Sequence, residues 1–295
     1  MLRFVCSVVM AVVLMSAPCS ALTTADFLRI PVGGKALAMG EVFTAIADDA
    51  SAMYWNPAGM AGIKSMQAFA MYNNYLLASM HGVGSFVMPM KNDLALGAMF
   101  TYYAQESFDL LDDNGTVIGT VAPSDMAVSV GGSKLFSQQL SVGAAGKFIS
   151  STLYQKTATA FAADIGAIYN LNPDISFGAS VRNLGTSMTF VSEAQGLPMT
   201  IAAGAVYKRK MSSTNNLTAG GEFAMCDGKT KISFGGEYSL NNIFLRAGYL
   251  LNDTQKSYTL GAGLALQKLR IDVAYIPYKL LGDTFSVSLS YALGN

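Results

Sequence analysis

Apolar residues alternate with small or polar residues over most of the chain after residue 64. The segment 174–182 is one example, with the sequence DISFGASVR. The same alternation recurs at 231–240, 258–267 and 284–293. A period of two places the two sets of side chains on opposite faces of a β-strand. The pattern therefore predicts a series of strands, each about ten residues long and apolar on one face.

Runs of this kind number about fourteen, an even number as in bacterial outer-membrane barrels. Turn-forming residues separate several of them, for example Asp227-Gly228 and Asn252-Asp253. The longest connection, 107–124, carries the sequence DDNG between apolar residues, which predicts a small hairpin among the extracellular loops. The predicted strands begin near Ser65, Ser79, Asp93, Asp125, Gln139, Thr157, Asp174, Pro198, Thr214, Lys229, Asn242, Gln255, Lys268 and Asp283.

The composition indicates that much of the surface does not face water. Hydrophobic residues make up 52% of the chain and charged residues 13%, whereas a soluble domain carries about 25% charged residues. No apolar run long enough for a membrane-spanning helix follows residue 64. A secreted β-sandwich would also alternate, but one of its faces must meet water, and the less apolar face here is mostly Gly, Ala, Ser and Thr. We therefore predict an all-β transmembrane barrel of about fourteen antiparallel strands.

The N-terminal residues have the layout of a cleavable signal peptide. Arg3 is followed by an apolar run, and small residues precede a cleavage site after Ala21. An N-terminal membrane anchor is the alternative, but the run is shorter than the ~20 residues that a spanning helix needs. We expect the protein in the outer membrane, in contact with its lipids. The predicted divisions are a signal peptide at 1–21, an N-terminal hatch at 22–64 and a barrel at 65–295.

The stretch Asp26–Ile63 fits neither the signal-peptide pattern nor the strand pattern. It is rich in Gly, Ala and Met and has few charges. Asp49 is placed to cap a short helix over 50–54, and a proline favours an extended conformation in the residue before it. A barrel of about fourteen strands has a lumen too wide for small inward side chains to fill. We therefore predict that this stretch is a partly helical plug, with hatch or gate candidates at Trp55, Asn56, Pro57, Ala58 and Gly59.

Several charged residues belong to the face that would line the lumen. We expect pairs between Arg246 and Glu237 and between Arg270 and Asp272, because buried charges persist when they are paired. Ion pairs that hold the plug and fill the lumen are the interpretation we favour, and a substrate site is the alternative. The predicted lumen charges are Lys147, Asp164, Arg182, Lys208, Glu222, Glu237, Arg246, Arg270 and Asp272.

No arrangement of residues in the sequence points to catalysis, a metal or a cofactor. His81 is the only histidine and has no context for a triad or a zinc site, so we expect a satisfied structural residue. The glycines beside Lys35 lack the full spacing of a phosphate loop. Cys226 would be the one thiol left after cleavage, which excludes an internal disulfide. The 19 basic residues balance 19 acidic ones without a basic block, which argues against nucleic-acid binding.

Two segments of the predicted plug resemble the N-terminal signature of the PorV/PorQ family. They read GGKALAMG at 33–40 and ADDASAMYWNPAG at 47–59. That family is similar to the long-chain fatty-acid transporters of the FadL type. The resemblance implies an outer-membrane barrel with an N-terminal hatch, in which 56–58 match the Asn-Pro-Ala motif of the transporters. This chain is shorter than those transporters, and its predicted loops are short except at 107–124.

The resemblance implies two functions. In the FadL-type transporters, hydrophobic substrates enter through an apolar pocket near the outside, and a hatch movement opens a path. In the PorV branch, a member serves the type IX secretion system by receiving secreted cargo. We therefore expect a passive transporter of hydrophobic small molecules that is not an enzyme. The alternative is a protein-interaction barrel whose partners are secretion or cell-envelope proteins, and the plug would then be a fixed stopper as readily as a gate.

Overall fold

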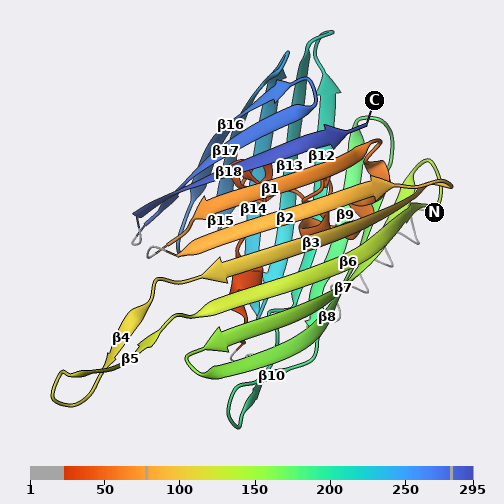
Figure 1. Cartoon of the computed structure of the whole chain (residues 1–295). Helices are drawn as coiled ribbons and strands as arrows, with labels where there is room; N and C mark the ends of the chain where they lie inside the picture. The colour runs from red at the N-terminus through yellow and green to blue at the C-terminus, as the bar shows by residue number, and fades with distance from the viewer. Residues whose placement is uncertain (1–22, 77–78, 280–281, 295) are drawn as a thin grey trace.

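The computed structural model describes residues 23–76, 79–279 and 282–294 (Figure 1). Fourteen antiparallel strands form one closed barrel, in which β1 (Met66–Asn74) pairs with β18 (Gly282–Leu293). Closure leaves the wall without an unpaired sheet edge. The other wall strands are β2 Met80–Pro89, β3 Leu94–Ala104, β6 Ser124–Leu135, β7 Leu140–Leu153, β8 Lys156–Asn170, β9 Ile175–Gly185, β12 Thr200–Lys210, β13 Asn215–Cys226, β14 Lys229–Leu240, β15 Ile243–Leu251, β16 Tyr258–Leu266 and β17 Leu269–Tyr278.

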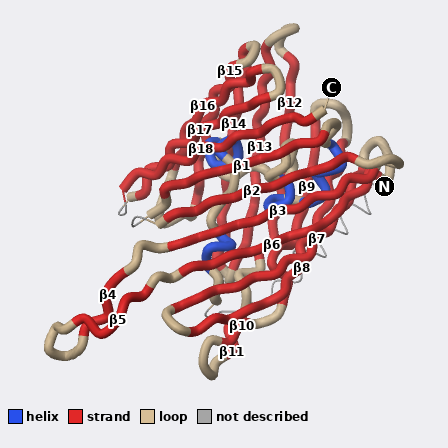
Figure 2. Tube along the Cα trace, in the orientation of Figure 1, coloured by secondary structure: helices blue, strands red, loops and turns tan. Residues whose placement is uncertain are grey.

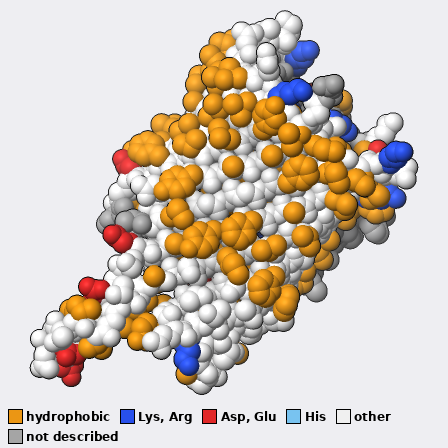
Figure 3. All heavy atoms as spheres, in the orientation of Figure 1, with side chains coloured by type: hydrophobic (Ala, Val, Ile, Leu, Met, Phe, Trp, Pro, Cys, Tyr) orange, Lys and Arg blue, Asp and Glu red, His pale blue; other side chains and the backbone are white. Residues whose placement is uncertain are grey.

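The predicted barrel of alternating strands is confirmed. Each wall strand begins within two residues of its predicted start except β16, which begins three residues after Gln255. The faces also follow the alternation: Phe234 is exposed on the outside, whereas Ser233 and Gly235 on either side of it are buried toward the lumen. Hydrophobic side chains are spread over the outer wall in Figure 3. An apolar belt of this kind is the surface that a bilayer requires.

The two ends of the barrel differ in their connections. At the end where β1 starts and β18 finishes, the strands are joined by tight turns such as 241–242 and 267–268, and we call this end the turn rim. The opposite end, which we call the loop rim, carries the longer connections 105–123, 186–199 and 252–257.

Two small hairpins lie in the loop-rim connections, outside the barrel sheet. The predicted hairpin in 107–124 is confirmed as β4 (Phe108–Leu111) and β5 (Val117–Val121), and it extends away from the barrel in Figure 1. The second, β10 (Met188–Thr189) with β11 (Ala194–Gln195), was not predicted. Its strands are two residues each, too short for any alternation to be recognised.

The segment from Thr23 to Ser65 is the plug, and its short helices are enclosed by the strands in Figure 2. Thr23 forms a parallel bridge with Gly196 at the loop rim, and the segment ends where β1 begins at the turn rim. Among the described residues, no helix is long and apolar enough to cross a membrane. The signal-peptide prediction lies outside the described residues. The plug elements are η1 Asp26–Arg29, α2 Gly34–Ala38, α3 Ala52–Trp55 and η2 Pro57–Gly62.

The helix predicted over 50–54 begins later than expected. The structure has it at 52–55, because the carboxylate of Asp49 accepts the backbone N–H of Ser51 at 2.9 Å and holds a turn ahead of the helix. Burial and the neighbouring Asp48 raise the pKa of the Asp49 carboxyl. The motif residue Asn56 is extended, as the following proline requires, with φ −161° and ψ 102°.

Candidate functional site

The hatch motif is buried against the barrel wall at Asn56, whose side chain is 0% exposed. Its amide nitrogen donates to the carbonyl oxygens of Thr44 at 2.8 Å, Ala167 at 3.1 Å and Ala179 at 3.3 Å. Its amide oxygen accepts the N–H of Ala58 at 3.1 Å. One side chain therefore joins two parts of the plug to β8 and β9, and an apolar residue would remove these buried hydrogen bonds.

The rest of the motif is held by close packing. The Trp55 indole donates to the carbonyl of Val32 at 2.7 Å and meets Phe43 edge-on, with 6.2 Å between ring centroids. In the wall, a Cβ added at Gly143 would lie 2.5 Å from the carbonyl carbon of Pro57, and one at Gly248 would lie 2.0 Å from the backbone nitrogen of Gly40. Both wall positions therefore require glycine, because the plug backbone rests directly on the strand.

Glu222 on β13 anchors the middle of the plug. Its carboxylate accepts the N–H groups of Phe43 and Thr44, each at 2.8 Å, and the hydroxyl of Thr44, also at 2.8 Å. Glu222 was predicted as a lumen charge, and in its buried position its hydrogen-bond partners are amides and a hydroxyl of the plug rather than a basic side chain. Sequence alternation identified the inward position, but it carried no signal for the backbone groups that the carboxylate meets.

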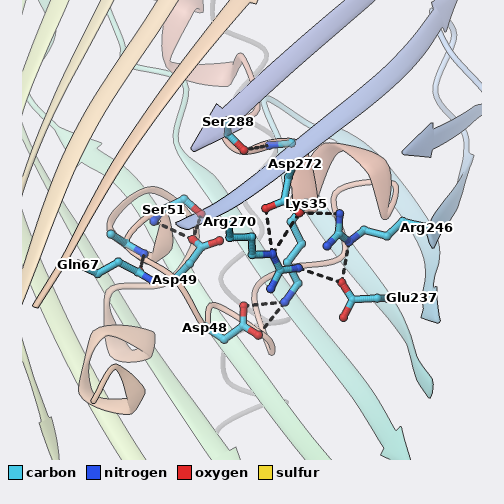
Figure 4. Close-up of polar contacts among 12 residues, drawn as sticks. Lys35, Asp48, Asp49, Ser51, Gln67, Glu237, Arg246, Arg270, Asp272 and Ser288 are labelled. Atoms are coloured by element: carbon cyan, nitrogen blue, oxygen red, sulfur yellow. Dashed lines mark hydrogen bonds and ion pairs between the residues drawn. The ribbon is translucent and has the colours of Figure 1, made fainter. Parts of the chain in front are cut away.

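The predicted charge pairs on the other wall strands form one network, shown in Figure 4. Arg246 on β15 lies 2.6 Å from Glu237 on β14 and 2.8 Å from Asp272 on β17. Arg270 bridges the same two carboxylates, at 3.3 Å and 3.1 Å. The two acids and two arginines therefore neutralise one another inside the barrel, which is the arrangement that makes buried charge tolerable.

The plug lies beside this network at Lys35 (Figure 4). The ammonium group of Lys35 is 2.7 Å from Asp48, another plug residue. The backbone N–H of Gly34 donates to the hydroxyl of Ser288 on β18 at 2.9 Å. A backbone hydrogen bond therefore attaches this part of the plug to the wall, and an ion pair joins two residues within the plug.

At the loop rim, Glu41 joins the plug to two lysines. It pairs with Lys231 at the start of β14 and with Lys256 in the 252–257 loop. Burial alone would raise the pKa of Glu41, but the two ammonium groups outweigh it and lower the pKa from 4.5 to about 2. Arg29 pairs with Asp227 in the turn after β13. The N-terminal part of the plug is therefore held to the loop rim by ion pairs, and the low pKa of Glu41 keeps its carboxylate ionised at neutral pH.

A cavity of about 1050 Å³ lies at the loop rim, between the N-terminal part of the plug and the loops. Aromatic and aliphatic side chains line it together with the ion pairs just described. Tyr103 and Tyr278 are among them, and both face inward. The apolar lining residues include Phe27, Ile30, Leu76, Leu153 and Phe190.

A smaller cavity of about 450 Å³ lies at the turn rim, lined by Lys35, Asp48, Lys208 and Arg270 among others. Buried plug residues, Phe43 and Trp55 among them, pack against the wall between it and the loop-rim cavity. Asn56 lines neither cavity. The structure thus has a chamber at each end and a packed plug between them.

The remaining predicted lumen charges have different surroundings. Lys147 pairs with Asp164 at 2.9 Å, whereas Arg182 stacks on the rings of Tyr54 and Trp55, with its guanidinium carbon 5.0 Å and 5.1 Å from their centroids. His81 on β2 is fully buried, and neither ring nitrogen has a hydrogen-bond partner within the described residues. The expectation that His81 is a structural histidine with hydrogen-bond partners is therefore wrong.

No group of three or more His, Cys, Asp or Glu side chains in the described part of the chain is arranged to hold a metal ion.

A family model described as "Type IX secretion system protein PorV" matches residues 17–227. A search of curated proteins gives no match.

Solved structures with a similar fold include two toluene transporters and a FadL homologue. The Pseudomonas putida toluene transporter TodX is 12% identical with a TM-score of 0.66, and the match covers 94% of this chain and 99% of that one. The Ralstonia pickettii toluene transporter TbuX is 14% identical with a TM-score of 0.63, covering 89% and 98%. A Pseudomonas aeruginosa FadL homologue is 14% identical with a TM-score of 0.60, covering 90% and 99%. At these identities the likeness shows the fold alone.

Proposed function

Because the chain belongs to the PorV family of type IX secretion system proteins, we propose that it is an outer-membrane barrel that admits hydrophobic small molecules passively through its loop rim. The main observation in support of this proposal is the cavity of about 1050 Å³, whose lining includes the apolar side chains of Phe27, Ile30 and Phe190. A site of this size and lining can bury most of a small apolar molecule. The toluene transporters TodX and TbuX, which share the fold, support the same substrate class.

The plug is the hatch in this proposal. A solute bound at the loop rim reaches the turn rim only if contacts such as those of Asn56 are rearranged, because the plug core is packed between the two chambers. Wall contacts at Gly143 and Gly248 set how far the plug can shift. We do not assign an enzymatic activity: the family and the similar structures are secretion components and channels.

Uptake by cells that carry the barrel in their outer membrane tests this proposal. Phe190→Glu places a carboxylate in the cavity, where apolar solute would have to lie against a charge. We expect the initial rate of labelled toluene uptake to fall by about tenfold. Val191→Glu is the matched control, because Val191 is adjacent in sequence and 83% exposed. Equal uptake by cells with and without the barrel, for toluene and for longer hydrocarbons, would contradict the proposal.

A second function, a protein-interaction barrel, is favoured by the β4–β5 hairpin. This hairpin extends from the loop rim and exposes Phe108, Leu111, Val117 and Ile118. Exposed apolar side chains on an arm of this kind suit a protein partner. Pull-down of envelope proteins with wild-type barrel and with a Leu111→Ser/Ile118→Ser variant tests it. Recovery of the same proteins by both forms would count against the hairpin as the binding element.

A further inference from the structure

Arg182 on β9 is a buried cation without a counter-ion. It is 7% exposed, and among the described residues its guanidinium forms no ion pair. Its Nη1 donates to the carbonyl of Tyr54 at 3.4 Å, and its Nε has no hydrogen-bond partner. An arginine in this state is costly to bury, since its charge is removed from water and is not paired.

The carboxylates closest to Arg182 along the wall are already engaged. Asp164, where the register between β8 and β9 shifts, is 2.9 Å from Lys147 and also accepts the N–H of Asn183 at 2.7 Å. Glu222 acts on Arg182 through longer-range attraction, but its oxygens accept three hydrogen bonds from the plug. Neither acid is placed to give Arg182 the close partner that its planar guanidinium suits.

A cavity of about 280 Å³ lies at this position, and Arg182 is part of its lining. Lys229 and the hydroxyl-bearing Thr200 and Thr230 line it too. Of the other charged residues in the lining, Lys231 is paired with Glu41, and Arg29 with Asp227 and Asp26. Asp253 also lines the cavity, and its carboxylate accepts the backbone N–H groups of Gln255 and Lys256. Within the described residues, the two cations Arg182 and Lys229 outnumber the one carboxylate of Asp253, so the charge that is left over is positive, and the hydroxyl groups supply further donors.

We propose that this cavity binds a small oxyanion group, a carboxylate or a phosphate, through the guanidinium of Arg182. Two oxygens of either group match the fork of N–H donors that Arg182 presents. The tyrosine and tryptophan rings that stack on the guanidinium belong to the hatch, so the bound group touches the residue on which Tyr54 and Trp55 rest. The inference goes beyond the uptake of uncharged hydrocarbons and does not depend on it.

The test measures the melting temperature and the binding isotherm of the detergent-solubilised full-length protein with inorganic phosphate or acetate. Chloride at equal ionic strength and pH is the reference. We expect a saturable rise in melting temperature with at least one of the two anions. A response to phosphate alone assigns a phosphate site, and a response to acetate assigns a carboxylate site.

Arg182→Met is expected to weaken the binding of that anion by at least about tenfold, since it removes a charge-assisted contact. Arg209→Gln removes the same charge from an exposed position on β12 and should leave binding unchanged. Wild-type protein without a saturable response to either anion overturns the proposal. So does an unchanged isotherm in Arg182→Met.

A second variant keeps the test decisive if Arg182→Met does not fold. Thr200 is the direct cross-strand partner of Arg182 and lines the same cavity. Thr200→Asp supplies a carboxylate about 5 Å away between Cβ atoms. We expect this variant to fold with an unchanged or higher melting temperature and to lose the anion response. A Thr200→Asp protein that binds the anion as wild type does would contradict the assignment. Toluene uptake, which involves no charge, reports on the proposed transport separately.

Discussion

Gly143→Ala adds one methyl group to the wall of β7 and directs it at the hatch motif. The new Cβ would lie 2.5 Å from the carbonyl carbon of Pro57 and 2.6 Å from the nitrogen of Ala58. Unbonded carbon atoms in contact lie about 3.5–4.0 Å apart. The plug backbone must therefore move by roughly 1 Å, or the strand must bend away from it.

The cost follows from two effects. Overpacking of a closely packed interior costs about 1–3 kcal/mol. A shift of Ala58 also weakens its 3.1 Å hydrogen bond to the Asn56 side chain, and the loss of such a bond contributes about 1 kcal/mol. We expect Gly143→Ala to lower the free energy of unfolding by about 2–4 kcal/mol.

Urea unfolding in detergent measures this difference, and limited proteolysis reports whether the plug segment becomes accessible. Gly84→Ala is the control: Gly84 is an exposed glycine of wall strand β2, and a Cβ there meets no atom within 4 Å. If Gly143→Ala and Gly84→Ala unfold at the same urea concentration and resist protease equally, the plug does not rest on the wall as described.

Three further changes test the attachment of the plug and the ion-pair network of the wall. Asn56→Ala removes the buried hydrogen bonds of this side chain and should destabilise the protein by about 2–4 kcal/mol in urea unfolding, more than Asn216→Ala at an exposed position of β13. Arg246→Met leaves Glu237 and Asp272 with Arg270 alone, and we expect a loss of about 3–5 kcal/mol by the same measurement, with no loss as the contradicting result. The pKa of Glu41 is lowered on folding from 4.5 to about 2. The ionised carboxylate therefore contributes about 3 kcal/mol of stability above pH 4.5, and this contribution is lost as the pH falls toward 2. Glu41→Gln should melt at a lower temperature than wild type at pH 7, and the difference between the two melting temperatures should narrow between pH 4.5 and pH 2.

The barrel itself was predictable from the sequence because alternation has one physical meaning in a strand. Ser286 and Ser288 fall between Phe285, Val287 and Leu289, and the structure places the serines in the lumen and the apolar residues outside. The same alternation places Tyr103 inward, because it lies two residues after the buried Thr101 on the same strand. Tyrosine favours any strand, so its presence near a strand end does not by itself decide the face.

The details of the site were less predictable, since they depend on contacts between distant parts of the chain. The high glycine content was visible, but nothing in the sequence singled out Gly143 and Gly248 as the positions on which the plug rests. Arg246 and Glu237 were expected to pair because they lie on adjacent strands, and they do. Arg182 was also expected among the ion pairs of the lumen. In the structure its guanidinium stacks on Tyr54 and Trp55 of the plug, a contact that only the folded plug creates.

Conductance of the purified protein in planar bilayers tests the central claim most directly. That claim is that a packed plug separates the loop-rim cavity from the turn-rim cavity. A barrel of this strand number with an open lumen would carry ions. The structure predicts that wild-type protein inserts without a steady ion current. A constant ohmic current from each inserted molecule would show an open lumen and contradict the account.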